Sequence, residues 1–433
     1  MRVVQSPISG EPRYNSPLCA EAKRGGSAAN FVGEGHFVRA QVDYHLDRPA
    51  EEELLFEKAG ARQRIFFDPP RTRAAIVTCG GLSPGLNNVI RSVFLELTMN
   101  YGVPEVLGIR YGYQGLNPKQ GREPLRLTLS MVEGIHQLGG TILGTSRGSQ
   151  DPAVMADFLA DRKIDILFCV GGDGTQRGAH ALYEEITRRG LPIAIVGIPK
   201  TIDNDIAFCD RTFGFTTAVE EAERVIAGAH VEAKGPRYGI GLVKVMGREA
   251  GFIAAAATLA SQEVNFTLIP EVPLRLDGPK GFLATLRRRM LEREHAVIVV
   301  AEGVGAAMVD RQTAQRDASG NLKLPDIGPV LKDAILKYFA ENGPPVDVKY
   351  IDPSYVIRSV PANCEDDILC DQFGRRAVHA AMAGKTGVLL GHLSGTFVHV
   401  PIAMSVGQKR RVNVEGELWN AVLSATGQPR SFE

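Results

Sequence analysis

One carboxylate, Asp173, stands where a buried strand is predicted to end and a helix to begin. It follows the apolar run 164–170 and lies in the turn Gly171-Gly172-Asp173-Gly174. Glycines let the backbone approach an anion closely, and the N–H groups of the first helical turn point at the same spot. A carboxylate repels phosphate unless a cation lies between them, so Asp173 is expected to bind Mg²⁺. Occurring alone, such a turn is as often a plain tight connection.

A second pair of carboxylates, Asp203 and Asp205, follows the strand predicted over 193–198. One of them could accept the proton of an attacking hydroxyl while the other holds water or metal nearby. Two carboxylates in such a loop can also simply be solvated or cap the next helix. Further glycine-rich turns favour the catalytic interpretation: Gly80-Gly81 ends another predicted strand, and Arg147 leaves a glycine-rich segment where it could clamp a triphosphate.

The α/β pattern restarts at about residue 215, with strands predicted over 238–245, 266–270, 296–301 and 348–351. Three charged residues, Arg248, Glu302 and Arg358, follow strands of this second unit. Guanidinium groups suit a phosphate and a carboxylate suits hydroxyls, so the set matches a sugar phosphate.

These elements predict an α/β protein with two doubly wound, Rossmann-like domains that face each other across a cleft. At 433 residues the chain is too long for one ordinary core. The expected parts are an N-terminal extension (1–70), a nucleotide-binding domain (71–214 plus 357–405), a sugar-phosphate-binding domain (215–356) and a C-terminal tail (406–433). Within the extension we expect an edge strand over 37–42 and a short helix over 50–59.

The composition argues against several classes of partner. Lys plus Arg equals Asp plus Glu at 49 each, so no overall charge attracts nucleic acid or an anionic membrane. No apolar run approaches the roughly 20 residues of a membrane span, and no signal-peptide core is evident. The six cysteines lack metal-ligand spacing, as in proteins of a reducing compartment. We therefore expect a cytoplasmic protein.

Five ordered motifs together resemble the 6-phosphofructokinases, over about residues 64–405. They are Gly80-Gly81 with Pro84-Gly85-Leu86-Asn87, Gly171-Gly172-Asp173-Gly174-Thr175, Pro199-Lys200-Thr201-Ile202-Asp203-Asn204-Asp205, Met246-Gly247-Arg248 and the strand that ends at Glu302. The chain is most similar to the branch with a long N-terminal extension found in plants, kinetoplastids and some bacteria. Ile65-Phe66-Phe67-Asp68-Pro69 and Tyr350-Ile351-Asp352-Pro353 carry that similarity.

The resemblance implies transfer of a phosphoryl group from Mg-ATP to the 1-hydroxyl of D-fructose 6-phosphate, which gives fructose 1,6-bisphosphate and ADP in a committing step of glycolysis. It makes Asp203 the base and Asp173 the Mg²⁺ ligand. The further catalytic residues it implies are Thr201, Asp205 and Arg248. Those implied for the nucleotide are Gly80, Arg147, Gly148, Gly171, Gly172, Gly174, Thr175 and Gln176. Those implied for the sugar phosphate are Thr201, Ile202, Asp203, Met246, Gly247, Arg248, Glu302, Tyr355 and Arg358.

Three positions depart from the bacterial allosteric members of this family. Tyr355 replaces a histidine and Lys349 an arginine, which suits the long branch. At Gly239 no arginine is present to reach into a neighbouring subunit. This puts a substrate site shared between subunits in doubt, although a homodimer or homotetramer is still expected.

The phosphoryl donor depends on two positions, Gly174 and Lys200. In the family, pyrophosphate users typically carry aspartate and lysine there, and short ATP users carry glycine at both. An aspartate at 174 would repel the α-phosphate, so its absence favours ATP over the pyrophosphate-dependent alternative. A lipid or dinucleotide kinase could share the Gly-Gly-Asp-Gly-Thr turn but lacks the other motifs. An inactive nucleotide sensor is disfavoured because Asp173 and Asp203 are both present.

Overall fold

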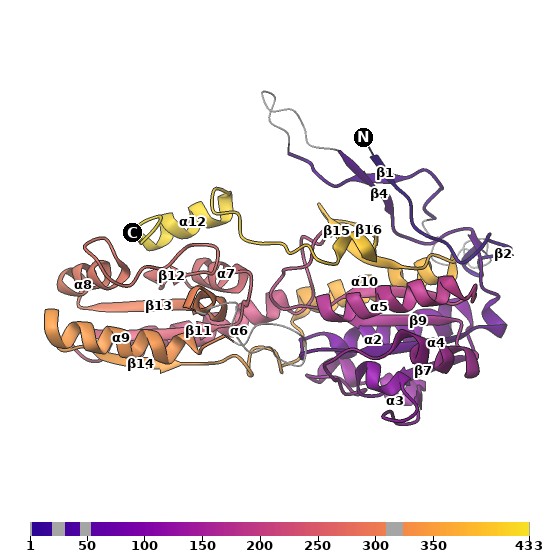
Figure 1. Ribbon diagram of the computed structural model, residues 1–433, viewed down its shortest axis with the longest axis horizontal. Coiled ribbons are helices and arrows are strands. Elements are labelled where there is room, and N and C mark those ends of the chain that lie inside the picture. Colours follow the sequence, from indigo (N-terminus) through magenta and orange to yellow (C-terminus); the bar gives the residue numbers. More distant parts are fainter. Residues whose placement is uncertain (1, 20–30, 44–52, 309–323, 433) are drawn as a thin grey trace. The chain divides into compact units, whose positions relative to one another are not determined.

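The computed structural model describes residues 2–19, 31–43, 53–308 and 324–432, which form two compact units (Figure 1). Unit 1 comprises Met1–Thr201, Ile206–Gly214 and Val360–Gln408. Unit 2 comprises Ile202–Asp205, Phe215–Ser359 and Lys409–Glu433. The chain thus passes from one unit to the other directly after Thr201.

Unit 1 is built on a ten-stranded sheet with the order β1-β4-β16-β15-β10-β9-β6-β7-β8, and β3 pairs with β4. The strands are β1 (Arg2–Val4), β3 (Phe37–Arg39), β4 (Leu54–Lys58), β6 (Arg73–Thr78), β7 (Glu105–Ile109), β8 (Leu125–Arg126), β9 (Ile166–Gly171), β10 (Ala194–Pro199), β15 (Val388–Leu393) and β16 (Thr396–Pro401). The five central strands, from β15 to β7, run parallel. A separate pair joins β2 (Tyr14–Asn15) and β5 (Arg64–Ile65).

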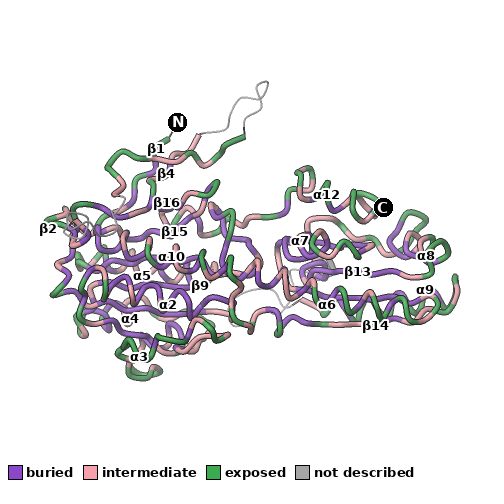
Figure 2. The backbone as a smooth tube through the Cα atoms, turned by 180° about the vertical axis from the view of Figure 1, so that it is seen from behind, coloured by how far each residue is buried: buried purple, intermediate pink, exposed green. Residues whose placement is uncertain are grey.

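Helices cover the parallel strands of unit 1. They are α2 (Leu86–Leu95), α3 (Leu129–Val132), α4 (Pro152–Asp161), α5 (Asp173–Arg188), α10 (Cys364–Met382) and α11 (Ile402–Ser405). Every residue of β9 and β10 is buried, and the burial colours of Figure 2 show the same for the centre of the sheet. Continuous apolar runs of this kind are typical of parallel strands covered on both faces. The predicted α/β class with parallel sheets is confirmed.

The prediction of a short helix over 50–59 is wrong. Residues 50–52 lie outside the described part of the chain, and the rest contains strand β4, which pairs with β1, β3 and β16. Phe56 is fully buried in β4 and packs in a cluster with Val398 and Val400 of β16. Pairing with the sheet edge has outweighed the local helical pattern, because strand formation depends strongly on such neighbours. The edge strand predicted over 37–42 is confirmed for Phe37–Arg39.

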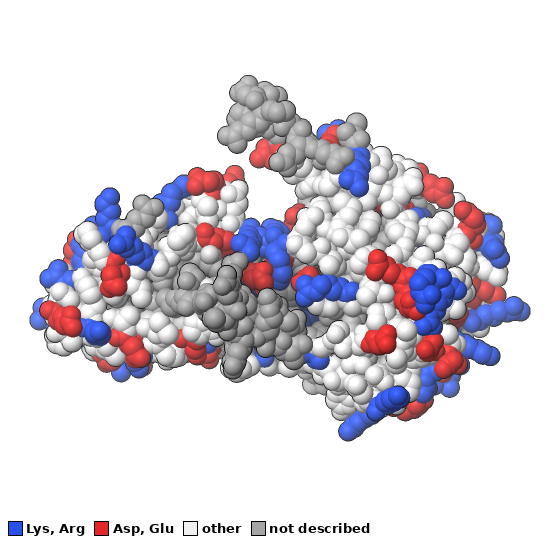
Figure 3. Space-filling view, viewed as in Figure 1, with Lys and Arg blue, Asp and Glu red and all other residues white. Residues whose placement is uncertain are grey.

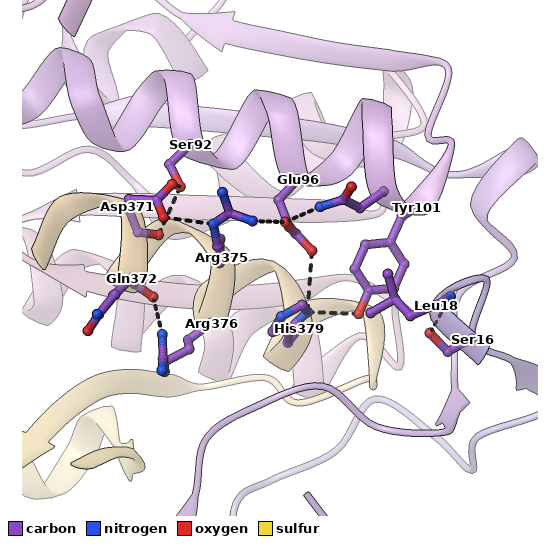
Figure 4. A network of polar contacts seen from close by, with 11 residues as sticks. Ser16, Leu18, Ser92, Glu96, Tyr101, Asp371, Gln372, Arg375, Arg376 and His379 are labelled. Carbon is purple, nitrogen blue, oxygen red and sulfur yellow. Dashed lines mark hydrogen bonds and ion pairs between the residues drawn. The ribbon is translucent and has the colours of Figure 1, made fainter. Parts of the chain in front are cut away.

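A polar network joins α10 to the π-helix Glu96–Tyr101, which continues α2, as Figure 4 shows. Arg375 on α10 donates to Asp371 (Nε to Oδ2, 2.7 Å) and contacts Glu96 (Nη1 to Oε2, 3.3 Å), whose side chain is only 3% exposed. The hydroxyl oxygen of Tyr101 lies 2.9 Å from Nδ1 of His379. Burial lowers the pKa of His379 to about 3, so the ring is neutral and can accept a hydrogen bond from the Tyr101 hydroxyl. The network fixes the helix that follows the first glycine-rich turn.

Unit 2 contains a four-stranded parallel sheet in the order β12-β13-β11-β14. Its strands are β11 (Gly239–Val245), β12 (Phe266–Leu268), β13 (His295–Ala301) and β14 (Asp347–Ile351). Its helices are α6 (Phe215–Lys234), α7 (Phe252–Ser261), α8 (Phe282–Arg293), α9 (Ile327–Asn342) and α12 (Glu417–Thr426). Trp419 of α12 is fully buried in a cluster with residues of α7, so the C-terminal stretch belongs to this core.

Across the described residues, no helix of either unit combines the length and the apolar character needed to cross a membrane.

Candidate active site

The glycine-rich turns of unit 1 follow neighbouring parallel strands. Gly80 comes after β6, Gly171 ends β9, and Lys200 follows β10. The chain continues from β6 to β7 on one side, whereas β9 lies on the other side of β6. The direction of winding therefore reverses between β6 and β9. In open α/β sheets, ligands bind outside the carboxyl ends of the strands at such a point.

The turn 171–174 is shaped by close packing. A Cβ at Gly171 would lie 2.1 Å from Oγ1 of Thr175, so no larger residue fits. Gly172 is the N-cap of α5, and the helix begins at Asp173. A Cβ at Gly174 would meet nothing nearer than the Arg177 guanidinium at 3.9 Å. The first turn of α5 therefore presents its backbone without side-chain cover at 174, which is the arrangement that binds phosphate.

Lys200 lies between the turns that follow β6 and β9. Its side chain is almost buried, and Nζ donates to the carbonyl of Gly81 at 2.7 Å. Nζ would be 3.4 Å from a Cβ at Gly80, and the Lys200 carbonyl would be 3.2 Å from one at Gly172. The ammonium group of Lys200 is thus held by the backbone beside both glycine turns. There it could contact a phosphate of ATP or of pyrophosphate.

Hydrogen bonds bring the segment containing Arg147 to the same edge of the sheet. The Gly80 N–H donates to the Ser146 carbonyl at 3.0 Å, and Oγ1 of Thr145 donates to the Gly80 carbonyl at 2.7 Å. Arg147 itself is exposed. Gly148 has a φ of 104°, which favours glycine. The structure therefore brings Arg147 and Gly148 close to Gly80, at the sheet edge where β6 ends.

The carboxylate of Asp173 accepts a hydrogen bond from Nη1 of Arg177 at 2.5 Å, one helical turn further on. Among the described residues, no group of three or more His, Cys, Asp or Glu side chains could hold a metal by itself. Mg²⁺ usually binds through one or two carboxylates, with substrate phosphates and water as its other ligands. Asp173 fits Mg²⁺ in this way only, as an ion carried with the nucleotide.

Two residues expected to contact the nucleotide support the turn from beneath. Gln176 is 2% exposed, and its Nε2 donates to the Gly171 carbonyl at 3.0 Å. Thr175 is buried, and its carbonyl accepts the Tyr113 hydroxyl at 2.7 Å. The Gln176 side chain is thus directed into the protein. Its contribution is to the shape of the turn.

In unit 2, Asp203 lies among charged groups from three other segments. Burial raises the pKa of Asp203 to about 8, and the negative charges of Asp205 and Glu302 act in the same direction. A hydrogen bond from the Arg248 backbone and the charge of Lys409 oppose this increase in the pKa. A carboxylate with a pKa near the working pH can both take and release a proton, as a general base must.

Strand register brings the next two predicted segments together. Val245, at the end of β11, is paired with Ala301, at the end of β13, so Met246 and Glu302 follow neighbouring strands. Gly247 has a φ of 126°, and a Cβ there would lie 2.6 Å from the Ala250 carbonyl. The Gly303 N–H donates to the Gly247 carbonyl at 3.0 Å. These constraints fix Arg248 beside Glu302.

Glu302 is electrostatically linked to the arginines that were predicted to bind phosphate. Burial raises the pKa of Glu302, while Arg248, Lys244 and Arg358 counteract this. The guanidinium of Arg358 stacks over the ring of Tyr355, 4.8 Å from its centre. Tyr355 is 74% exposed, so its ring lies open at the surface of unit 2. Arg248 and Arg358, both proposed for the sugar phosphate, thus lie near one half-buried carboxylate, that of Glu302.

The predicted residues divide between the two units. Unit 1 holds Gly80, Arg147, Gly148, Gly171, Gly172, Asp173, Gly174, Thr175, Gln176, Lys200 and Thr201, and unit 2 holds Ile202, Asp203, Asp205, Met246, Gly247, Arg248, Glu302, Tyr355 and Arg358. The carbonyl of Thr201 accepts a hydrogen bond from Oγ1 of Thr212 at 2.7 Å. The loop with the two aspartates is therefore anchored in unit 1 at Thr201, two residues before Asp203.

Sequence reasoning missed two basic residues of unit 2. Nζ of Lys409 lies 2.8 Å from Oδ2 of Asp205, and Lys244 lies 2.7 Å from Oδ2 of Asp352. Lys409 opens the basic run 409–411, a signal that could have been weighed as a partner for the aspartate pair. Lys244 gave no such signal, because it stands within an otherwise apolar strand.

Comparison with known proteins gives one consistent result. A family model described as phosphofructokinase matches residues 73–381. ATP-dependent 6-phosphofructokinase of Borreliella burgdorferi is 48% identical over 431 residues, covering 98% of this chain and 96% of the relative. The enzyme of the same name from Amycolatopsis methanolica is 44% identical, and the alignment covers 98% of this chain and 95% of the relative. That of Trypanosoma brucei brucei is 45% identical and covers 90% and 82%.

Solved structures show the same fold at lower identity. A pyrophosphate-dependent phosphofructokinase from Marinobacter aquaeolei aligns with a TM-score of 0.67 and 20% identity, covering 83% of this chain and 93% of that one. Phosphofructokinase from Saccharomyces cerevisiae aligns with a TM-score of 0.60 and 25% identity, covering 82% and 48%.

The pKa of Asp203 generates a prediction about stability. Its pKa is about 8 in the folded protein and about 4 in an unfolded chain, so between these values the folded state binds more protons. Wild-type stability from this group is therefore lost as the pH rises towards 8. We expect Asp203→Asn, which cannot ionise, to gain on the order of 1–3 kcal/mol relative to wild type between pH 5 and pH 8. Urea unfolding without substrates measures this gain. A difference that stays constant with pH would contradict it.

Proposed function

Because the chain belongs to the phosphofructokinase family, we propose that it phosphorylates D-fructose 6-phosphate at the 1-hydroxyl with Mg-ATP, a committing step of glycolysis. The observation that carries this function is Asp203, held with a pKa of about 8 among Asp205, Glu302 and the Arg248 backbone. Relatives 44–48% identical over nearly the whole chain are named ATP-dependent 6-phosphofructokinase, which favours ATP over pyrophosphate as donor.

The roles follow from the chemistry of each group. Asp203, when ionised, accepts the proton of the 1-hydroxyl, whose oxygen forms a bond to the γ-phosphorus as the bond to ADP breaks. The backbone of the turn after β9 and the ammonium of Lys200 bind the phosphates of the donor. Bound Mg²⁺, with Asp173 as a ligand, supplies positive charge for the phosphate oxygens. Such transfer needs positioning and charge stabilisation more than covalent help.

We assign the acceptor to unit 2 and the nucleotide to unit 1. Arg248 and Arg358 offer guanidinium groups for the 6-phosphate, and Glu302 offers a carboxylate for sugar hydroxyls. The positive charges of Arg248 and Arg358 both lower the pKa of Glu302, which supports this grouping.

We expect Asp203→Ala to lower kcat by roughly 10²–10⁴, since it removes the base, while binding of fructose 6-phosphate stays nearly intact. Arg248→Ala is the matched comparison and should chiefly weaken substrate binding, because it removes a phosphate contact. A coupled assay for ADP release, run with and without fructose 6-phosphate, measures both. Near-normal turnover of Asp203→Ala would remove Asp203 from the mechanism, and unchanged affinity of Arg248→Ala would remove unit 2 as the sugar site.

The donor is tested at Gly174. Because a Cβ there would meet only the Arg177 guanidinium, at 3.9 Å, Gly174→Asp should fold and place a negative charge in front of α5, where it would repel ATP. Gly174→Asn is the matched control, since it adds similar bulk without charge. We expect wild type to use ATP with little or no use of pyrophosphate, and only the aspartate variant to lose ATP use sharply. Wild-type preference for pyrophosphate would show that Lys200 sets the donor instead.

We further propose a cytoplasmic homodimer or homotetramer that binds no nucleic acid or membrane. None of the six cysteines forms a disulfide, which is consistent with a reducing compartment. Acidic and basic side chains are interspersed within each unit on the face shown in Figure 3. The oligomeric state is best measured by light scattering on the intact chain, because Phe56 of the N-terminal extension is part of the unit 1 core. A monomer at micromolar concentration would contradict the proposed assembly.

A further inference from the structure

The segment that begins at Lys409 lies along the loop that carries the two catalytic aspartates. Nζ of Lys409 contacts Oδ2 of Asp205 at 2.8 Å, and the Arg410 N–H donates to the Asp205 carbonyl at 2.9 Å. Nη1 of Arg410 also lies 3.3 Å from the carbonyl of Asn204. All of these residues belong to unit 2. The segment follows the residues matched by the family model, which end at 381.

The loop has a conformation that needs such support. Asn204, between the two aspartates, has a φ of 55°, in the left-handed region that a non-glycine residue seldom adopts. Residues in this region persist only where the surrounding structure fixes them, and they occur often at active sites. Arg410 contacts the loop on the residue with this backbone, and its guanidinium stacks 4.6 Å from the ring centre of Phe252 on α7.

The segment is itself firmly anchored. The Val412 N–H donates to Oε1 of Glu271 at 2.8 Å, and the same carboxylate accepts the Gly251 N–H at the start of α7. Val412 and Trp419 are both buried in the core around α7. Lys409 is therefore presented to Asp205 from a fixed backbone, and its side chain is only 26% exposed.

We propose that Lys409 is a positioning residue for the proposed transfer: its ammonium group holds the Asp205 carboxylate in place and sets a positive charge beside the aspartate pair that contains the base, Asp203. This role rests on the proposed function. The groups that face Asp203 are Asp205, Glu302 after β13, the Arg248 backbone after β11, and Lys409. Of these, Lys409 brings a positive side chain that offsets the two neighbouring carboxylates. The C-terminal segment thereby acts on the active site as well as on the core.

The test is the pH dependence of kcat in Lys409→Met. Without the ammonium, Asp203 keeps its proton to higher pH, because like charges nearby disfavour its ionisation. We expect kcat at pH 7 to fall roughly tenfold and to recover as the pH is raised, with a smaller change in KM for fructose 6-phosphate. Lys409→Arg keeps the charge and should retain the wild-type profile. A purely structural defect would lower kcat equally at every pH, which would overturn the proposal.

Two further variants complete the experiment. Arg430→Met removes a cation from the same C-terminal segment, where it pairs with Glu415 at 2.7 Å, and should leave the profile unchanged. Lys409→Gln is a smaller neutral replacement that should reproduce the shifted profile if Lys409→Met does not fold. Wild-type profiles for the neutral variants would overturn the role of Lys409 alone. A wild-type chain that releases no ADP with fructose 6-phosphate would overturn this role and the proposed function together.

Discussion

The crowding of carboxylates in unit 2 is the constraint on which the proposed chemistry depends. The negative charges of Asp205 and Glu302 raise the pKa of Asp203, and burial raises the pKa of both Asp203 and Glu302. Cations from separate segments, among them Arg248 and Lys409, offset part of that increase. The result is that the proposed base, Asp203, has a raised pKa of about 8 and can still lose its proton near neutral pH. Removing the charge of Asp205, Glu302 or Lys409 would therefore change the pKa of Asp203.

The proposed role of unit 1 has a different requirement, which is a backbone that side chains leave open to a phosphate. Gly171 is required by the packing of Thr175 behind it, whereas a Cβ at Gly174 would meet nothing nearer than the Arg177 guanidinium at 3.9 Å. The two glycines thus do different things within one turn: the first permits the sharp connection, and the second leaves the first turn of α5 accessible. Gln176 ties the turn to the end of β9, because its Nε2 donates to the Gly171 carbonyl.

Much of this could be predicted from the sequence, because buried parallel strands form continuous apolar runs and the polar residues after them meet at one sheet edge. The runs that became β9, β10 and β13 were found in this way. Strand β4 was missed, since its partners β1 and β16 come from distant parts of the chain. The inward direction of Gln176 was also hidden, because the type of residue does not say which side of a turn it faces.

Lys409 was missed for a related reason, and the reason bears on how the site is built. It lies 204 residues from Asp205 in the sequence, so no spacing connects them. Motifs within the family region can supply the acids and the glycines, but the electrostatic environment of the acids depends on every segment that packs against them. The pKa of the proposed base, Asp203, therefore depends on several segments of unit 2, including a C-terminal segment that carries no recognisable motif.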